Sequence, residues 1–298
     1  MREPSSTALG DAFIRASHLQ RSAAPVQRDG VAAALLRPEE VQRFRAGILR
    51  SLRGQREVRA DEEDAAVTAW LHHESAAAPV VLLRGWYTEA VLELHARGGV
   101  DHYVVLGAGL DSFAWRRPEW ALEMEVTEVD LPITQAGKLR RLDGARLPQE
   151  QARFVPADLD SAEPELALVR AASAHPTFVS FNGVSYYLGA ARTLATLRAL
   201  RALLPGLVEV VFDYWDEEHA RPGRRSRAVE SMFRSLERNR EPVAEVYSEA
   251  DLAALVERAG YRVVEDRPMT WHSAAARELG LEALTAPPIA RFARLAPA

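Results

Sequence analysis

The spacing of hydrophobic residues along the chain changes near residue 99. Before it, apolar positions recur every three or four residues, as in Val41, Phe44, Ile48 and Leu52. That spacing is typical of amphipathic helices. We therefore expect residues 1–98 to form a helical N-terminal cap.

After residue 99, short apolar runs alternate with longer segments of helical pattern. The expected strands are residues 102–106, 124–129, 152–157, 177–181 and 207–212, and the expected helices are 134–147, 160–173 and 189–204. This alternation predicts parallel βαβ units in one open sheet.

The last third continues the α/β pattern. A helix is expected between an N-cap at Ser248 and a stop at Gly260, followed by strands at 261–266 and 289–295. No clear long helix separates these two strands, so we expect an antiparallel pair at the sheet edge. A charged segment with Pro and Gly, residues 219–230, is interpreted as a mobile loop within a lid-like insertion around 216–247, or else as a solvated surface loop.

Composition narrows the class of protein. The chain has 298 residues, of which 48% are hydrophobic, and this suits one integrated domain in which an α/β part at 99–298 carries the cap. A net charge of -5 gives no basic field for nucleic acid. There is no cysteine, no signal-peptide pattern and no apolar run that would span a bilayer. We expect a cytoplasmic protein that binds neither membrane nor nucleic acid, with no metal site.

The first predicted strand runs into a glycine loop in "YVVLGAGLDSFAWR", residues 103–116. Gly107, Ala108 and Gly109 are small enough to let backbone amides approach a ligand closely. In an open parallel sheet, ligands bind beyond the carboxyl ends of the strands. A Gly-x-Gly pair also occurs in simple tight turns, so the loop alone does not settle the ligand.

Acidic residues follow the next two strands. Glu128 and Asp130 end the second strand, and Asp130 stands 21 residues after Gly109, where a carboxylate can accept both hydroxyls of a ribose. The alternative is that both acids merely end the strand. Asp158, after the third strand, is placed to accept from an adenine amino group with Leu159 against the ring, or to cap a helix.

Two positions in the loop distinguish between nucleotides. A dinucleotide fingerprint has a third Gly or Ala where this chain has Ser112, and Asp111 would repel a pyrophosphate. S-adenosylmethionine has no phosphate and carries an ammonium and a sulfonium. Charge therefore favours S-adenosylmethionine over NAD.

The stretches "VVLGAGLDSFAWR", "TEVDLPITQAGKL", "FVPADL" and "FVSFNGVSYYL" occur in this order between residues 104 and 188, and the resemblance they carry covers roughly residues 7–265. This set resembles the leucine carboxyl methyltransferase-like family of S-adenosylmethionine-dependent O-methyltransferases, which includes bacterial enzymes of polyketide and other natural-product biosynthesis. The resemblance implies a Rossmann-like class I methyltransferase with a seven-stranded, mostly parallel sheet, an antiparallel last strand and a helical N-terminal cap.

The resemblance also implies a set of cofactor-binding residues. They are Arg84, Gly107, Ala108, Gly109, Asp111, Glu128, Asp130, Asp158, Leu159 and Asn182. Arg84 would pair with the cofactor's carboxylate, unless it is a surface arginine. Asn182 stands where many members have an acid, and Ser112 and Phe113 where threonine and arginine are common. Lys138, the only lysine, is expected to support the ribose loop by an ion pair or a cap.

The chemistry of the acceptor sets a further expectation. A carboxylate is already a nucleophile, whereas a hydroxyl needs a base, and none of His18, His175, His219 and His272 lies in a recognisable base motif. This favours, as the family does, a carboxylate of a small molecule.

Aromatic residues beyond the fourth and fifth strands are candidates for the acceptor site. The candidates for positioning the acceptor are Asn182, Tyr186 and Tyr187. The candidates for binding it are Tyr187, Tyr214 and Trp215. The alternative is that these aromatic side chains pack the cap helices onto the sheet. Three other functions stay open: methylation of a hydroxyl or phenol, methylation of a protein C-terminus, and a catalytically inactive cofactor-binding partner. We expect a monomer or a homodimer.

Overall fold

The computed structural model describes residues 5–161, 175–239 and 241–298. The expected helix at 160–173 therefore lies almost wholly outside the described residues. The described α-helices are α1 (Ser6–Arg21), α2 (Pro38–Arg53), α3 (Glu63–Ala69), α4 (Ala78–Arg97), α5 (Pro132–Gly144), α7 (Ser185–Leu203), α8 (Glu217–Ala220), α9 (Arg227–Arg238), α10 (Glu249–Arg258) and α11 (Met269–Glu278). The strands are β1 (His102–Leu106), β2 (Glu125–Asp130), β3 (Arg153–Pro156), β4 (Thr177–Ser180), β5 (Leu207–Trp215), β6 (Tyr261–Pro268) and β7 (Ala290–Pro297).

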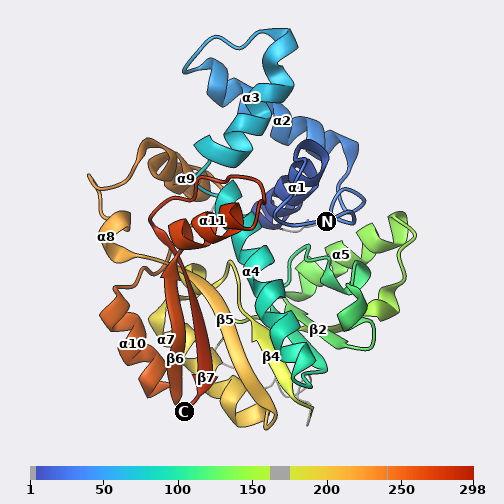
Figure 1. Cartoon of the computed structure of the whole chain (residues 1–298), viewed down its shortest axis with the longest axis vertical. Helices are drawn as coiled ribbons and strands as arrows, with labels where there is room; N and C mark the ends of the chain where they lie inside the picture. The colour runs from blue at the N-terminus through green and yellow to red at the C-terminus, as the bar shows by residue number, and fades with distance from the viewer. Residues whose placement is uncertain (1–4, 162–174, 240) are drawn as a thin grey trace.

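The seven strands form one sheet in the order β3-β2-β1-β4-β5-β7-β6 (Figure 1). Neighbouring strands from β3 to β5 pair in parallel, whereas β7 pairs antiparallel with both β5 and β6. This is the expected mostly parallel sheet with an antiparallel last strand. The chain order reverses direction at β1, between β2 and β4, which is where an open α/β sheet leaves room for a ligand.

Alternate residues of β1 pack on opposite faces of the sheet. Tyr103 and Val105 belong to a hydrophobic cluster that includes residues of α1, α2 and α4. Val104 and Leu106 belong to a second cluster formed with α7 and α10. Successive side chains of a strand point to opposite faces, so a continuous apolar run such as "YVVL" is required when both faces are covered.

The N-terminal helices are anchored by buried polar contacts. Arg141 of α5 donates to both carboxylate oxygens of Glu40 in α2, at 2.8 and 2.7 Å. The backbone N–H of Val26 donates to His18 Nε2, so His18 carries its proton on Nδ1 and donates to His72 Nε2 at 3.0 Å. These buried contacts hold α1 and α2 in place above the ends of the strands (Figure 1).

Two segments differ from expectation. β6 and β7 form the expected antiparallel edge pair, but α11 lies between them in the chain; its buried positions include Met269 and His272. The segment 219–230, interpreted as a loop, contains the end of α8 and the start of α9 at residue 227. α9 forms there because Val229 and Phe233, four residues apart, are buried in one cluster with Trp215. In the described part of the chain, no helix has the length and apolarity needed to cross a membrane.

Candidate functional site

A cavity of about 740 Å³ lies at the carboxyl ends of β1, β2 and β4. Its size is within the range of small-molecule sites, about 300–1,000 Å³. The predicted cofactor residues that line it are Arg84, Gly107, Ala108, Gly109, Asp111, Asp130, Asp158, Leu159 and Asn182. The geometry thus brings together every predicted cofactor residue except Glu128.

The loop after β1 depends on its two glycines. Gly107 and Gly109 have φ angles of 65° and 52°, a region that residues with a side chain rarely adopt. A Cβ at Gly107 would lie 2.3 Å from a methyl group of Val184. Glycine is therefore required at 107 both by conformation and by the close approach of the loop that follows β4.

Asp130 connects this loop to the end of β2. Its carboxylate accepts hydrogen bonds from the backbone N–H of Gly109 and of Leu131, both at 2.6 Å. Burial raises the pKa of Asp130, while the two amides oppose that shift. Two amides leave further lone pairs on the carboxylate, and Asp130 lines the cavity, so it can also accept from ligand hydroxyls.

Glu128 does not reach the cavity, and its predicted role needs correction. The side chain is 1% exposed, and its Oε2 accepts from Lys138 Nζ of α5 at 2.5 Å. Glu128 pairs with Val105 inside the sheet, whereas Asp130 lies at the strand end. α5 thus covers Glu128, which lies two residues before the end of β2. Lys138 indeed makes an ion pair, as expected, and it is a buried one.

The other two predicted acids that line the cavity, Asp111 and Asp158, accept hydrogen bonds from backbone amides near their own positions. Asp111 Oδ1 accepts from the N–H of Phe113 at 2.8 Å, and Asp158 Oδ1 accepts from the N–H of Asp160 at 2.9 Å. Leu159 is buried beside Asp158 and lines the same wall. The carboxylates are therefore oriented by the backbone, and the apolar side chain lies next to them.

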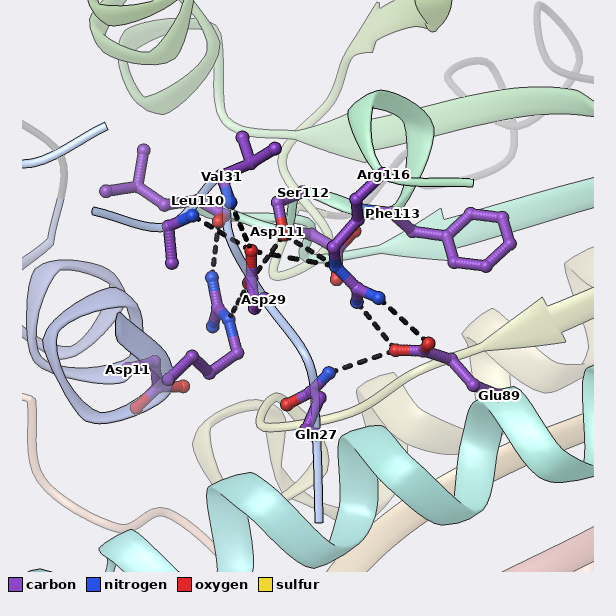
Figure 2. A network of polar contacts seen from close by, with 12 residues as sticks. Asp11, Gln27, Asp29, Val31, Glu89, Leu110, Asp111, Ser112, Phe113 and Arg116 are labelled. Atoms are coloured by element: carbon purple, nitrogen blue, oxygen red, sulfur yellow. Dashed lines mark hydrogen bonds and ion pairs between the residues drawn. The ribbon is translucent and has the colours of Figure 1, made fainter. Parts of the chain in front are cut away.

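Ser112 and the residues after it hold the N-terminal cap against the loop (Figure 2). Ser112 Oγ donates to Asp29 Oδ2 at 2.6 Å, and Arg15 Nε of α1 donates to the same oxygen at 2.7 Å. Arg116 Nε donates to Ser112 Oγ, and its two terminal nitrogens bind both oxygens of Glu89 in α4. The tail of the loop, "SFAWR", thus joins the loop to two helices of the cap.

Arg84 of α4 is buried in the cavity wall between two acids. Its Nη2 lies 2.6 Å from Asp11 Oδ2 of α1, and its Nη1 lies 3.0 Å from Asp213 Oδ2 of β5 and 3.2 Å from the hydroxyl of Tyr186. The guanidinium lies against the backbone near Gly183, where a Cβ would come within 2.8 Å of Nη2. Arg84 is accordingly not a surface arginine.

The aromatic candidates divide into two groups. Tyr187 lines the large cavity and also a smaller adjacent hollow of about 60 Å³, whose wall includes Tyr186 and Trp215. The rings of Tyr186 and Trp215 stack with centroids 4.4 Å apart. Tyr214 needs correction: it is fully buried, donates to Asp266 of β6 at 2.6 Å and lines neither hollow. Successive residues of β5 point to opposite faces, so Tyr214 and Trp215 could not both face the site.

Comparison with known proteins identifies the family. Residues 8–201 match the family model described as leucine carboxyl methyltransferase. The chain belongs to this family. It is accordingly an S-adenosylmethionine-dependent methyltransferase, and S-adenosylmethionine is its cofactor.

One relative agrees with this assignment, and one solved structure shares the fold. YktD of Bacillus subtilis (strain 168), provisionally assigned as an S-adenosyl-L-methionine-dependent methyltransferase, is 30% identical over 270 residues, or 88% of each chain. A crystal structure from Thermobifida fusca YX, provisionally assigned as a methyltransferase, superposes with a TM-score of 0.55 over 99% of this chain and 95% of that one at 14% identity. This second likeness concerns the fold alone.

The charges of the cavity fit the cofactor of a methyltransferase. The acids that line it are Asp11, Glu89, Asp111, Asp130, Asp158, Asp160 and Glu241, and the only described basic residues among its lining are Arg15 and Arg84. Both arginines are already paired with carboxylates. A cavity with this excess of negative charge favours a ligand that carries a sulfonium and an ammonium.

Asn182 provides a second test of whether the cavity suits S-adenosylmethionine. Its amide nitrogen donates to Thr88 Oγ1 at 2.8 Å, while its Oδ1 is buried in the described structure without a hydrogen-bond partner. Buried acceptors without partners are uncommon and costly. In this methyltransferase, an unmatched acceptor in the cavity wall suits a ligand that brings an N–H donor, such as the ammonium group of the cofactor.

Several lining residues of the methyltransferase escaped the sequence motifs. Thr88 and Glu89 follow Arg84 at helical spacing on α4, and Thr7, Ala8 and Asp11 lie at similar spacing on α1. The helical period could have added Thr88 and Glu89 to Arg84. The helical period could not have indicated that α1 faces the same cavity, because Asp11 of α1 and Arg84 of α4 are 73 positions apart in the chain.

None of the histidines considered as bases lines the cavity of the methyltransferase. His18 and His272 are fully buried elsewhere, and burial lowers the pKa of each to about 4. His175 and His219 pair with Asp101 and Asp216 away from the site. Histidine base chemistry therefore has no support in the described structure.

Proposed function

We propose that this methyltransferase transfers the methyl group to an oxygen atom of a small molecule, such as an intermediate of natural-product biosynthesis. The observation that carries the proposal is the pair of adjoining hollows. The large cavity and the small one share Thr7, Asp11, Val81, Arg84 and Tyr187. A ligand held by the glycine loop and an acceptor in front of Tyr187 would meet at this shared wall.

The roles of the cofactor residues follow from their positions. Asp130 would accept from the ribose hydroxyls, Leu159 and Asp158 would contact the adenine, and Asn182 Oδ1 would accept from the ammonium. When bound, S-adenosylmethionine supplies an electrophilic methyl group on a positively charged sulfur. The chain's own contribution is to orient the acceptor in line with that group and to exclude water.

The small hollow favours an acceptor with an apolar body. Its wall includes the side chains of Val80, Trp215, Met232, Leu236 and Ile289. Such a wall gives hydrophobic contact area without hydrogen bonds to match. Tyr186 and Tyr187 line this hollow, Tyr187 in the wall shared with the large cavity, and would position the acceptor, whereas Trp215 would contact its apolar body.

A carboxylate is the acceptor group that the family favours. It needs no base, and no histidine lines the cavity. A hydroxyl is the second candidate, for a specific reason: Asp11 lies in the wall that both hollows share, and burial raises its pKa. A carboxylate of that kind is a better proton acceptor than one in water.

Product chemistry separates the two acceptors. The full chain is incubated with methyl-labelled S-adenosylmethionine and a panel of aromatic carboxylic acids and phenols. Label that is released by mild base indicates a methyl ester, and label that resists base indicates an ether. Label on a nitrogen or carbon atom of the product would contradict O-methylation. The variant Trp215→Ala should raise the KM for the acceptor and leave the binding of S-adenosylhomocysteine unchanged.

A further inference from the structure

Arg84 is the one cavity arginine that lies at the boundary of both hollows in the described structure. Its terminal nitrogens are occupied by Asp11 at 2.6 Å and by Asp213 at 3.0 Å. Its side chain is 11% exposed, so these contacts are largely screened from water. One buried guanidinium therefore already has two carboxylates around it.

The two carboxylates differ in how firmly they are held. Asp213 is fully buried in β5, and its other oxygen accepts from the backbone N–H of Gly183 at 2.6 Å. Asp11 is 20% exposed, lines the cavity, and has Arg84 as its only described hydrogen-bond donor. Of the two, Asp11 is the one that can move or lose its charge without leaving a buried amide unmatched.

Two carboxylates already leave one net negative charge beside Arg84, and a third would add another. Like charges within a few ångströms in a partly buried site repel strongly, and proteins usually relieve this by protonating one of them. Burial already raises the pKa of Asp11, against the effect of Arg84 and Arg15 and with a contribution from Asp213. The charged or titratable groups that face Asp11 are Arg84 of α4, Arg15 of α1, Asp213 of β5, and Tyr186 and Tyr187 of α7.

We propose that a ligand carboxylate takes Arg84 over from Asp11 and that Asp11 binds one proton from solvent as this happens. The guanidinium keeps two anionic partners, Asp213 and the ligand, and Asp11 becomes a neutral carboxylic acid. Binding of the carboxylate is then coupled to proton uptake and weakens as the pH rises. This rests on the proposed placement of the cofactor.

The carboxylate could belong to the methionine part of the cofactor or to the acceptor. Three probes distinguish the two: S-adenosylhomocysteine, 5′-methylthioadenosine, which has the same nucleoside but no amino-acid group, and 5′-methylthioadenosine together with benzoate. Titration calorimetry of the full chain in two buffers of different ionisation enthalpy at one pH measures the protons taken up by each.

We expect uptake of about one proton with S-adenosylhomocysteine and none with 5′-methylthioadenosine, in keeping with a single titrating carboxyl. Uptake only when benzoate is added would assign the carboxylate to the acceptor and still support the exchange. Binding without uptake in all three titrations would overturn the exchange alone. Failure of both nucleosides to bind would overturn the cofactor placement and the exchange together.

The variant Asp11→Asn tests the contribution of Asp11 by itself. The neutral side chain no longer competes for Arg84, so S-adenosylhomocysteine should bind about tenfold more tightly, the change equivalent to one pKa unit, and without proton uptake. Asp160→Asn is the matched control, because it removes an acid from the same cavity that has no contact with Arg84. Weaker binding in Asp11→Asn, or uptake that persists, would show that Asp11 holds the ammonium or plays no part.

Discussion

Ser112 Oγ lies 2.6 Å from Asp29 Oδ2, and this hydrogen bond connects the glycine loop of the sheet to the N-terminal cap. Asp29 is fully buried and also accepts from Arg15. Burial alone would raise the pKa of Asp29, but Arg15 and Arg116 outweigh burial and the net shift is downward. The hydroxyl of Ser112 thus serves assembly of the site.

Replacing Asp29 should therefore destabilise the protein strongly. In Asp29→Asn, Arg15 loses its buried counter-ion, and breaking a buried pair costs about 3–5 kcal/mol. Chemical denaturation near neutral pH measures the loss. Asp61→Asn is the control, because its ion pair with Arg59 is exposed, with 67% and 66% of the two side chains accessible, and exposed pairs contribute about 0–1 kcal/mol. Equal effects in both variants would contradict the anchoring role.

The buried pair of Glu128 and Lys138 predicts a pH dependence of stability. Burial raises the pKa of Glu128 to about 7, against the opposing effect of Lys138. A carboxyl whose pKa is higher in the folded state stabilises the fold below its unfolded pKa, and this contribution is lost as the pH rises towards 7. Relative to Glu128→Gln, the wild type should lose free energy of unfolding between about pH 4.5 and 7, by at most about 1.4 kcal/mol per pH unit. Parallel stability curves for the two proteins would refute this.

The unmatched oxygen of Asn182 predicts a selective effect on ligands. Asn182→Leu removes the acceptor, so S-adenosylhomocysteine should lose about 1.5–3 kcal/mol of binding free energy, the usual contribution of a hydrogen bond to a charged group. 5′-Methylthioadenosine has no ammonium and should bind as it does to the wild type. Asn182→Asp keeps an acceptor and should bind S-adenosylhomocysteine at least as well as the wild type. Calorimetry that finds both ligands equally affected by the leucine would contradict contact with the ammonium.

The sheet and the cofactor loop were predictable because their signals are local. Apolar runs covered on both faces gave the strands, and two glycines with acids at fixed spacing gave most of the cavity. The antiparallel edge was also predicted, since two strand patterns stood at the end of the chain. α11 was missed, because it buries a histidine whose ring packs against Tyr87 and Phe292 and so breaks the apolar pattern.

The remaining errors of the sequence-based prediction concern the direction in which side chains point and contacts between residues far apart in the chain. Glu128 and Asp130 both follow the pattern of acids near the end of a strand, yet only Asp130, the last residue of β2, lines the cavity, because α5 covers Glu128. Tyr214 and Trp215 are neighbours that point to opposite faces. Asp11 carries no motif, and its role depends on α1 packing against α4, a contact between distant parts of the chain.

The central claim is that the loop of Gly107–Asp111 and the carboxylate of Asp130 hold the cofactor. Calorimetric titration of S-adenosylhomocysteine into Asp130→Ala tests it most directly, with Asp160→Ala as the control and thermal melting to verify that both variants fold. Loss of hydrogen bonds that ligand hydroxyls donate to a charged carboxylate costs about 1.5–3 kcal/mol each, so we predict that affinity falls by at least about tenfold in Asp130→Ala only. An unchanged affinity in the folded Asp130→Ala variant would contradict the account.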